Sequence, residues 1–148
     1  MIIWVDADAC PKVIKEVLYR AAIRTKTSTI LVSNQPLTTP SSPYIKKKVV
    51  SAGFDVADKE IIDNVAAGDL VITADIPLAD AVIHKNATAI DPRGSLYTEL
   101  NIKQRLSMRN LHAELRSAGL VRGGPPTLTK KEVHAFSNCL DKFLTAVK

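Results

Sequence analysis

The sequence predicts an α/β fold with a central, mainly parallel sheet of four or five strands flanked by helices, followed by further C-terminal helices. Short apolar runs alternate with amphipathic stretches of about ten residues along residues 1–100, a pattern typical of parallel sheets with right-handed crossovers. From residue 101 to 148 the pattern is helical only. The length of 148 residues suits one domain with a substantial core. We therefore expect a single domain, 1–148, with an α/β part (1–100) and a helical part (101–148).

The individual elements follow from local patterns. Residues 70–74 (LVITA) form a continuous apolar run, which indicates a strand buried on both faces, and Pro77 then suits the first turn of a helix. By the same reasoning, the expected strands are residues 2–5, 29–33, 54–56, 70–74 and 87–90. The expected helices of the α/β part are residues 11–24, 44–52, 58–67 and 77–85.

Two long helices are expected after residue 100. Apolar residues on one face of the first helix, which Gly119 ends, are Ile102, Leu106, Leu111 and Leu115. A turn at residues 123–126 (GGPP) follows. Thr129 and Glu132 then form a capping box that opens the final helix. The residues of that helix expected to face inward are Val133, Phe136, Leu140, Phe143 and Leu144.

Composition limits the classes of protein to consider. Hydrophobic residues make up 46% of the chain and charged residues 24%, as in ordinary globular proteins. No apolar run approaches the roughly 20 residues that span a bilayer, and Met1 leads into a strand rather than a signal peptide. We expect a cytoplasmic protein with no membrane partner and with reduced cysteines.

The net charge of +5 is unevenly distributed. Residues 101–148 contain nine Lys or Arg against three Asp or Glu. A basic region beside an acidic cluster would suit a polyanion that is held or cut with the help of a metal. The alternative is that these charges belong to solvated helix faces.

Aspartates follow three of the expected strands. Asp6, Asp75 and Asp91 each come directly after an apolar run. The carboxyl ends of parallel strands meet at one edge of the sheet, where α/β proteins form their sites. Several carboxylates can share a pocket only if their pKa values rise or a cation neutralises them, and oxygen ligands favour Mg²⁺ or Mn²⁺. An Asp is also a common helix N-cap, which is the structural alternative.

The candidate residues differ in what else they could do. Asp6, Asp8 and Asp75 are the expected metal ligands, and the same three together with Asp80 are the candidate catalytic residues. Asp8 could instead cap the first helix, and Asp80 could simply suit a helix dipole. Asp69 precedes its strand, so a turn role at the opposite end of the sheet is the better interpretation. Asp63 could face the cluster or the solvent.

Other polar residues are candidates for binding. Asn34 follows the second expected strand, and Arg93, Arg109 and Lys130 are candidate phosphate contacts, although each could be a plain surface charge. Cys10 precedes Pro11 at a helix N-terminus, where the pKa of a thiol would fall. It is either a nucleophile or a structural thiol.

Several motifs resemble those of the YaiI/YqxD family of uncharacterised bacterial proteins. They are residues 5–11 (VDADACP), 32–35 (VSNQ), 68–79 (GDLVITADIPLA), 89–94 (AIDPRG), 96–98 (LYT), 101–102 (NI), 115–116 (LR) and 123–125 (GGP). The family is similar to the PIN-like nuclease superfamily. The resemblance implies a three-layer PIN-like fold and a metal-dependent nuclease acting on RNA. On that pattern, Asp6 and Asp75 match the acids after the first and fourth strands, and Asp8, Asp63 and Asp80 match less closely.

Three functions remain open. The leading hypothesis is a Mg²⁺- or Mn²⁺-dependent ribonuclease, a hydrolase. The second is a PIN-like module without activity that holds RNA or a partner. The third is a phosphatase of the haloacid-dehalogenase type, because residues 3–8 (IWVDAD) resemble its Asp-x-Asp signature. In that superfamily a second Asp pair follows a strand, whereas Asp69 precedes one.

Overall fold

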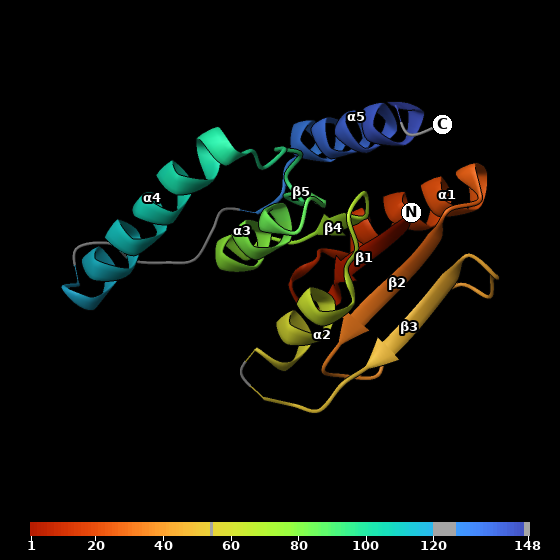
Figure 1. The fold of residues 1–148 in the computed structure, drawn as a ribbon, viewed down its shortest axis with the longest axis horizontal. Coiled ribbons are helices and arrows are strands. Elements are labelled where there is room, and N and C mark those ends of the chain that lie inside the picture. The colour runs from red at the N-terminus through yellow and green to blue at the C-terminus, as the bar shows by residue number, and fades with distance from the viewer. Residues whose placement is uncertain (54, 120–126, 147–148) are drawn as a thin grey trace.

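Five parallel strands form the centre of the molecule, in the order β3-β2-β1-β4-β5 (Figure 1). The computed structural model describes residues 1–53, 55–119 and 127–146. The strands are β1 (Ile2–Asp6), β2 (Ser28–Ser33), β3 (Ile45–Val49), β4 (Leu70–Ile72) and β5 (Thr88–Ile90). β1 lies in the middle and pairs in parallel with β2 on one side and β4 on the other. The expected parallel sheet is confirmed.

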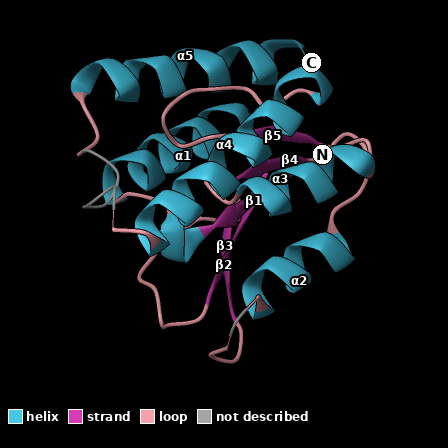
Figure 2. Cartoon of the chain, turned by 90° about the vertical axis from the view of Figure 1, so that its left-hand side faces the viewer, coloured by secondary structure: helices cyan, strands magenta, loops and turns pink. Residues whose placement is uncertain are grey.

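Helices cover both faces of this sheet (Figure 2). They are α1 (Lys12–Thr25), α2 (Val56–Asn64), α3 (Ile76–His84), α4 (Glu99–Ser117) and α5 (Lys130–Ala146), with a 3-10 turn at Ala7–Ala9. α1 and α5 pack over one face, and α2 and α3 pack over the other. α4 packs against α3. The three-layer architecture expected from the PIN-like resemblance is therefore present. Within the described residues, no helix combines the length and the apolar character needed to cross a membrane.

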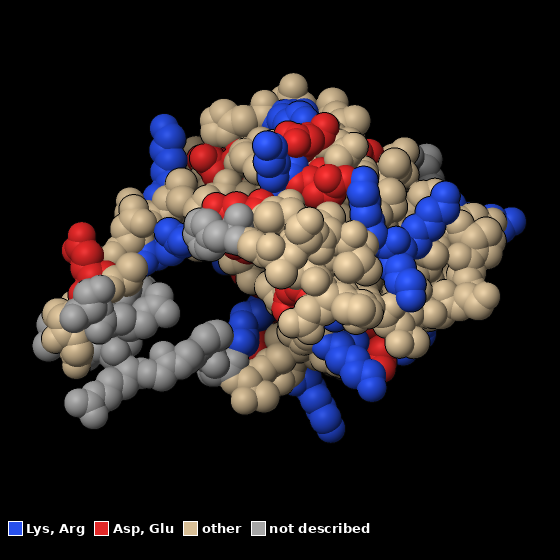
Figure 3. Space-filling view, turned by 90° about the horizontal axis from the view of Figure 1, so that it is seen from below, with Lys and Arg blue, Asp and Glu red and all other residues tan. Residues whose placement is uncertain are grey.

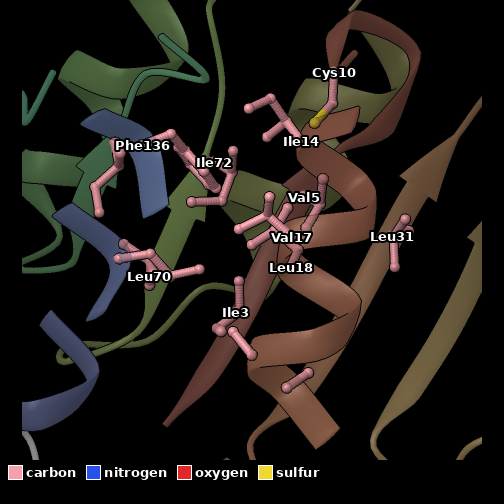
Figure 4. Close-up of a cluster of buried hydrophobic side chains, with 14 of the residues drawn as sticks. Ile3, Val5, Cys10, Ile14, Val17, Leu18, Leu31, Leu70, Ile72 and Phe136 are labelled. Carbon is pink, nitrogen blue, oxygen red and sulfur yellow. The ribbon is translucent and has the colours of Figure 1, made fainter. Parts of the chain in front are cut away.

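The alternation of side chains along β1 explains the two cores. Ile3 and Val5 are fully buried and pack with Leu18 of α1 in the core below α1 and α5 (Figure 4). Trp4, between them, points to the opposite face and packs in the core formed with α2 and α3. Successive residues of a strand face opposite sides of a sheet. An apolar run without polar interruptions therefore gives a strand that is buried on both faces.

The segment 44–56 differs from the prediction. The expected helix at 44–52 is instead β3, an edge strand whose Ile45 is buried while Lys46, Lys47 and Lys48 are exposed. Lysines protect an edge strand from pairing with other chains, and the same charges also suit a helix surface. The expected strand at 54–56 is also wrong: Asp55 is left-handed, with φ 62°, and Val56 already begins α2. Phe54 lies outside the described residues.

The C-terminal helices agree with the prediction in part. The capping box is confirmed: the Thr129 hydroxyl accepts from the Glu132 backbone N–H, and the Glu132 carboxylate accepts from the Thr129 backbone N–H. The expected inner face of α5 is confirmed as well. In α4, Ile102 is buried but Leu111 is 45% exposed, because α4 extends away from the sheet (Figure 1). The turn expected at 123–126 lies outside the described residues.

Candidate functional site

Asp6 and Asp75 meet at the carboxyl ends of β1 and β4, which are paired neighbours. Asp6 is 7% exposed and accepts a hydrogen bond of 3.1 Å from the Thr73 hydroxyl. That hydroxyl also accepts from the Asp75 backbone N–H at 2.9 Å. Asp75 in turn caps α3, because its Oδ1 accepts from the Leu78 N–H at 3.0 Å. Thr73 thus fixes both aspartates, and Asp75 combines a cap with a position at the site.

Asp58, in the first turn of α2, is a third carboxyl group at this edge, and it was not among the candidates from sequence. It lines a hollow of about 360 Å³ together with Asp55 and Asp75. The pKa of Asp58 is raised to about 7, first by burial, then by the charges of Asp75, Asp6 and Asp55 and by a hydrogen bond with Asp75. We call Asp6, Asp58 and Asp75 the acidic crevice.

The pKa of Asp6 is raised as well. Burial is the main cause, the hydrogen bond from Thr73 opposes it, and the charges of Asp75 and Asp8 add to it. Two carboxyl groups of one crevice therefore resist ionisation in the absence of a counter-charge. This is the electrostatic condition in which a bound cation would be stabilised.

A cation would have to be held by few protein ligands. Among the described residues, no three His, Cys, Asp or Glu side chains lie close enough together to hold a metal ion. Asp58 and Asp75 nevertheless form a hydrogen-bonded pair of carboxyl groups beside Asp6. Mg²⁺ is commonly bound through one or two carboxylates, with water and substrate phosphate completing its shell. The donor set fits a site of that kind and does not fit a preformed cage of three or more carboxylates.

Asp8 lies next to the acidic crevice but is held by β2. Its carboxylate accepts from the Ser33 hydroxyl at 3.0 Å and from the Asn34 backbone N–H at 2.7 Å. It does not cap α1, whose N-cap is Pro11 without a side-chain bond. The Asn34 side chain is half-buried, and its Oδ1 meets no hydrogen-bond partner within the part of the chain that the structure describes.

Three other aspartates from the sequence analysis, Asp63, Asp69 and Asp80, lie elsewhere. Asp80 lines a hollow between α3 and α4, and its carboxylate is 3.5 Å from His84 Nδ1, so the fold does not bring it to Asp6. Asp63 is exposed on α2. Asp69 accepts bonds from the Ile2 and Ala66 backbone N–H groups and from Trp4 Nε1 at the opposite end of the sheet. Its expected turn role is thereby confirmed.

The predicted binding residues separate into two kinds. Arg93 contacts both carboxylate oxygens of Glu132 at 2.8 Å, so it fastens the turn after β5 to α5. Lys130 is exposed in the first turn of α5, and Arg109 is exposed on α4. Arg109 alone of these residues lines the hollow of Asp58 and Asp75. Both Arg93 and Arg109 line a second, larger hollow of about 740 Å³.

Cys10 corrects an expectation from sequence. It is only 6% exposed, and burial raises the pKa of its thiol to about 12 instead of lowering it. The 3-10 turn directs the side chain into the core below α1, where Figure 4 shows it beside Ile14. Desolvation therefore outweighs the helix dipole, and the thiol is suited to packing rather than to nucleophilic attack.

The fold and the acidic crevice together define an α/β protein with carboxyl groups crowded at the carboxyl ends of its parallel strands. The chain belongs to the YaiI/YqxD family: the family model described as "Uncharacterized BCR, YaiI/YqxD family" matches residues 4–146.

Similar proteins cover the chain from end to end. A UPF0178 protein of Maridesulfovibrio salexigens is 59% identical over 98% of this chain and 96% of its own length. A UPF0178 protein of Dechloromonas aromatica is 56% identical over 99% of this chain and 98% of its own. A crystal structure of Rae1 (YacP) from Bacillus subtilis aligns over 100% of both chains, with a TM-score of 0.42 and 15% identity. A likeness of that extent carries no conclusion about activity.

Proposed function

We propose that this protein is a Mg²⁺- or Mn²⁺-dependent ribonuclease that hydrolyses phosphodiester bonds at the acidic crevice. The observation that carries the proposal is the convergence of three carboxyl groups, Asp6, Asp58 and Asp75, at the carboxyl ends of β1 and β4. Structural caps alone would not need three crowded acids, and burial together with their mutual repulsion raises the pKa values of Asp6 and Asp58.

The roles of the residues follow from their contacts. Asp58 and Asp75 would hold the cation, with Asp6 beside them and Asp8 adding negative charge. When bound, the cation would supply a Lewis acid for the phosphodiester and lower the pKa of water. Thr73 keeps Asp6 and Asp75 in register through its hydroxyl. Asp80 has no role in this proposal, because it faces His84 and the hollow between α3 and α4.

A module without activity, which holds RNA or a protein partner, is the second candidate. One observation favours it: the described residues contain no group of three or more potential ligands near enough to one another to hold a metal. A phosphatase using Asp6 as nucleophile and Asp8 as acid/base lacks such support. Asp69, which precedes β4, cannot serve in the second Asp pair of that superfamily, because it accepts hydrogen bonds from Ile2 and Trp4 at the opposite end of the sheet.

Calorimetry tests the proposal. Mn²⁺ is titrated into the wild type, into Asp75→Asn and into Asp63→Asn, with and without a non-cleavable RNA analogue. Asn is also a good N-cap, so Asp75→Asn keeps α3 while it removes the charge. Asp63→Asn makes the same charge change at an exposed position of α2 and is the matched control.

We expect saturable binding in the wild type and in Asp63→Asn, and binding weaker by about tenfold or more in Asp75→Asn. Absence of Mn²⁺ binding to the wild type under both conditions would reject the ribonuclease in favour of the module without activity. Hydrolysis of a phosphomonoester by the wild type, without cleavage of RNA, would favour the phosphatase.

A further inference from the structure

A second hollow lies beside the acidic crevice. It encloses about 740 Å³ between the carboxyl ends of the strands and α4, within the range of about 300–1,000 Å³ that is usual for ligand pockets. Its apolar wall includes Pro11, Ile76, Met108 and Leu128. Arg93, Arg105 and Arg109 bring three positive charges to the same hollow, and Asp91 brings one negative charge.

Arg105 is held in place with donor capacity left over. Its Nη2 donates to Asp91 Oδ2 at 2.7 Å, and its guanidinium lies over the Tyr97 ring at 4.2 Å from the ring centroid. Its Nη1 is shielded from solvent and meets no acceptor among the residues that the structure describes. A buried donor without a partner is uncommon in folded proteins, and an acceptor atom on a ligand would satisfy this one.

Arg109 connects the two hollows. It is exposed on α4 and lines both the 740 Å³ hollow and the hollow of Asp58 and Asp75. A ligand that extends from one hollow into the other could therefore place a phosphate against Arg109. Figure 3 shows Lys and Arg side chains mixed with Asp and Glu on the face drawn there, rather than one broad basic surface. Such a mixture of positive and negative side chains fits a ligand that is bound in a local hollow better than one attracted by a broad positive surface.

We propose that the 740 Å³ hollow binds one nucleotide of a single-stranded nucleic acid, with its base against the apolar wall and its phosphate at Arg105 and Arg109. The proposal rests on the proposed ribonuclease function, since it assigns the nucleotide next to the bond that would be cut. A base can enter such a hollow only when it is unstacked and unpaired, which selects a single strand over a duplex. A free nucleotide offers the same phosphate and base, so the test includes one.

The test measures binding without hydrolysis. Fluorescence anisotropy with EDTA present follows a labelled adenosine hexanucleotide, and unlabelled adenosine monophosphate and a duplex of equal length serve as competitors. The variants are Arg109→Ala and Arg105→Lys. The latter keeps the charge beside Asp91 but removes the planar guanidinium. The control is Lys103→Ala, which removes one exposed positive charge from α4 at a residue lining the hollow of Asp80 instead.

We expect the single strand to bind more tightly than the duplex, and binding to weaken by about tenfold in Arg109→Ala and in Arg105→Lys but to stay within about twofold in Lys103→Ala. Adenosine monophosphate should compete with the labelled strand for the wild type and compete less well for Arg109→Ala and Arg105→Lys. That result would support the hollow as a nucleotide site. Equal binding of duplex and single strand, or equal losses in Arg109→Ala and Lys103→Ala, would overturn the proposal. Because EDTA keeps metal ions out of this assay, the binding result stands whether or not the Mn²⁺ titration of the acidic crevice succeeds.

Discussion

Asp75 caps α3 and, in the proposed function, would also help to hold the cation. Its position directly after an apolar run made it predictable from sequence, as it did Asp6. Asp58 could not be found in that way because it follows no strand. It reaches the crevice because α2 begins near the carboxyl edge of the sheet, and the wrong assignment of residues 54–56 as a strand hid that start. Acids in the first turn of a crossover helix are the signal that would have found it.

The cap formed by Asp75 gives a prediction about stability. Asp75→Ala removes the acceptor of the Leu78 N–H, whereas Asp75→Asn retains one. We expect Asp75→Ala to lower the free energy of unfolding by about 1 kcal/mol relative to Asp75→Asn, measured by urea denaturation. Equal stability of the two variants would show that the cap contributes nothing.

Cys10 gives a prediction about reactivity. In a Cys139→Ser variant, Cys10 is the single thiol. Its burial and its pKa of about 12 leave almost no accessible thiolate at pH 8. We expect labelling by a disulfide reagent to be slow in the native protein and fast in urea. Fast native labelling of Cys10 would contradict the placement of its side chain in the core.

At the scale of elements, α5 completes a core that begins at the other end of the chain. Phe136 and Leu140 are fully buried in the cluster that contains residues of β1 and α1. The apolar spacing of α5 and its capping box predicted its inner face, but no local signal indicated what it would cover. Its docking depends on Gly94, whose added Cβ would lie 2.6 Å from the Phe136 backbone nitrogen.

Gly94→Ala should therefore be strongly destabilising. Gly94 has φ +99° and no room for a methyl group, whereas Gly68 has φ +89° and open space around it. Both Ala variants bear the cost of positive φ, and only Gly94→Ala adds the clash. We expect Gly94→Ala to lose about 2 kcal/mol more than Gly68→Ala in the free energy of unfolding. Similar losses in both would show that α5 does not pack there.

The Arg93–Glu132 pair adds a dependence on pH to the docking of α5. The hydrogen bond from Arg93 lowers the pKa of Glu132, and bonds from Thr129 lower it further. The folded pKa lies below the unfolded one, so the pair stabilises the fold above the ordinary value of 4.5, and this stabilisation is lost as the pH falls through the folded pKa.

Glu132→Gln should thus unfold more easily than the wild type at pH 7. We expect the two thermal unfolding curves to converge as the pH falls through the lowered pKa of Glu132 in the folded protein. A difference that stays constant with pH would mean that the carboxylate charge is not responsible.

For the whole molecule, the alternation of apolar runs and helices was enough to predict a parallel sheet with helices on both faces. The order of the strands could not be read from the sequence, because it depends on long-range pairing such as that of β1 with β4. The same limit applies to the site. The sequence suggested which acids lie at strand ends, but only the fold shows that Asp80 lies away from Asp6 and that Asp58 joins the acidic crevice.

The most direct measurement of the central claim is cleavage of a labelled RNA under single-turnover conditions with Mn²⁺. The wild type is compared with Asp58→Asn and with Asp63→Asn, which make the same substitution on the same helix. We predict cleavage by the wild type and by Asp63→Asn, and a loss on the order of a hundredfold or more in Asp58→Asn. Cleavage by Asp58→Asn at the wild-type rate, or no cleavage by the wild type, would contradict the assignment of the acidic crevice as a nuclease site.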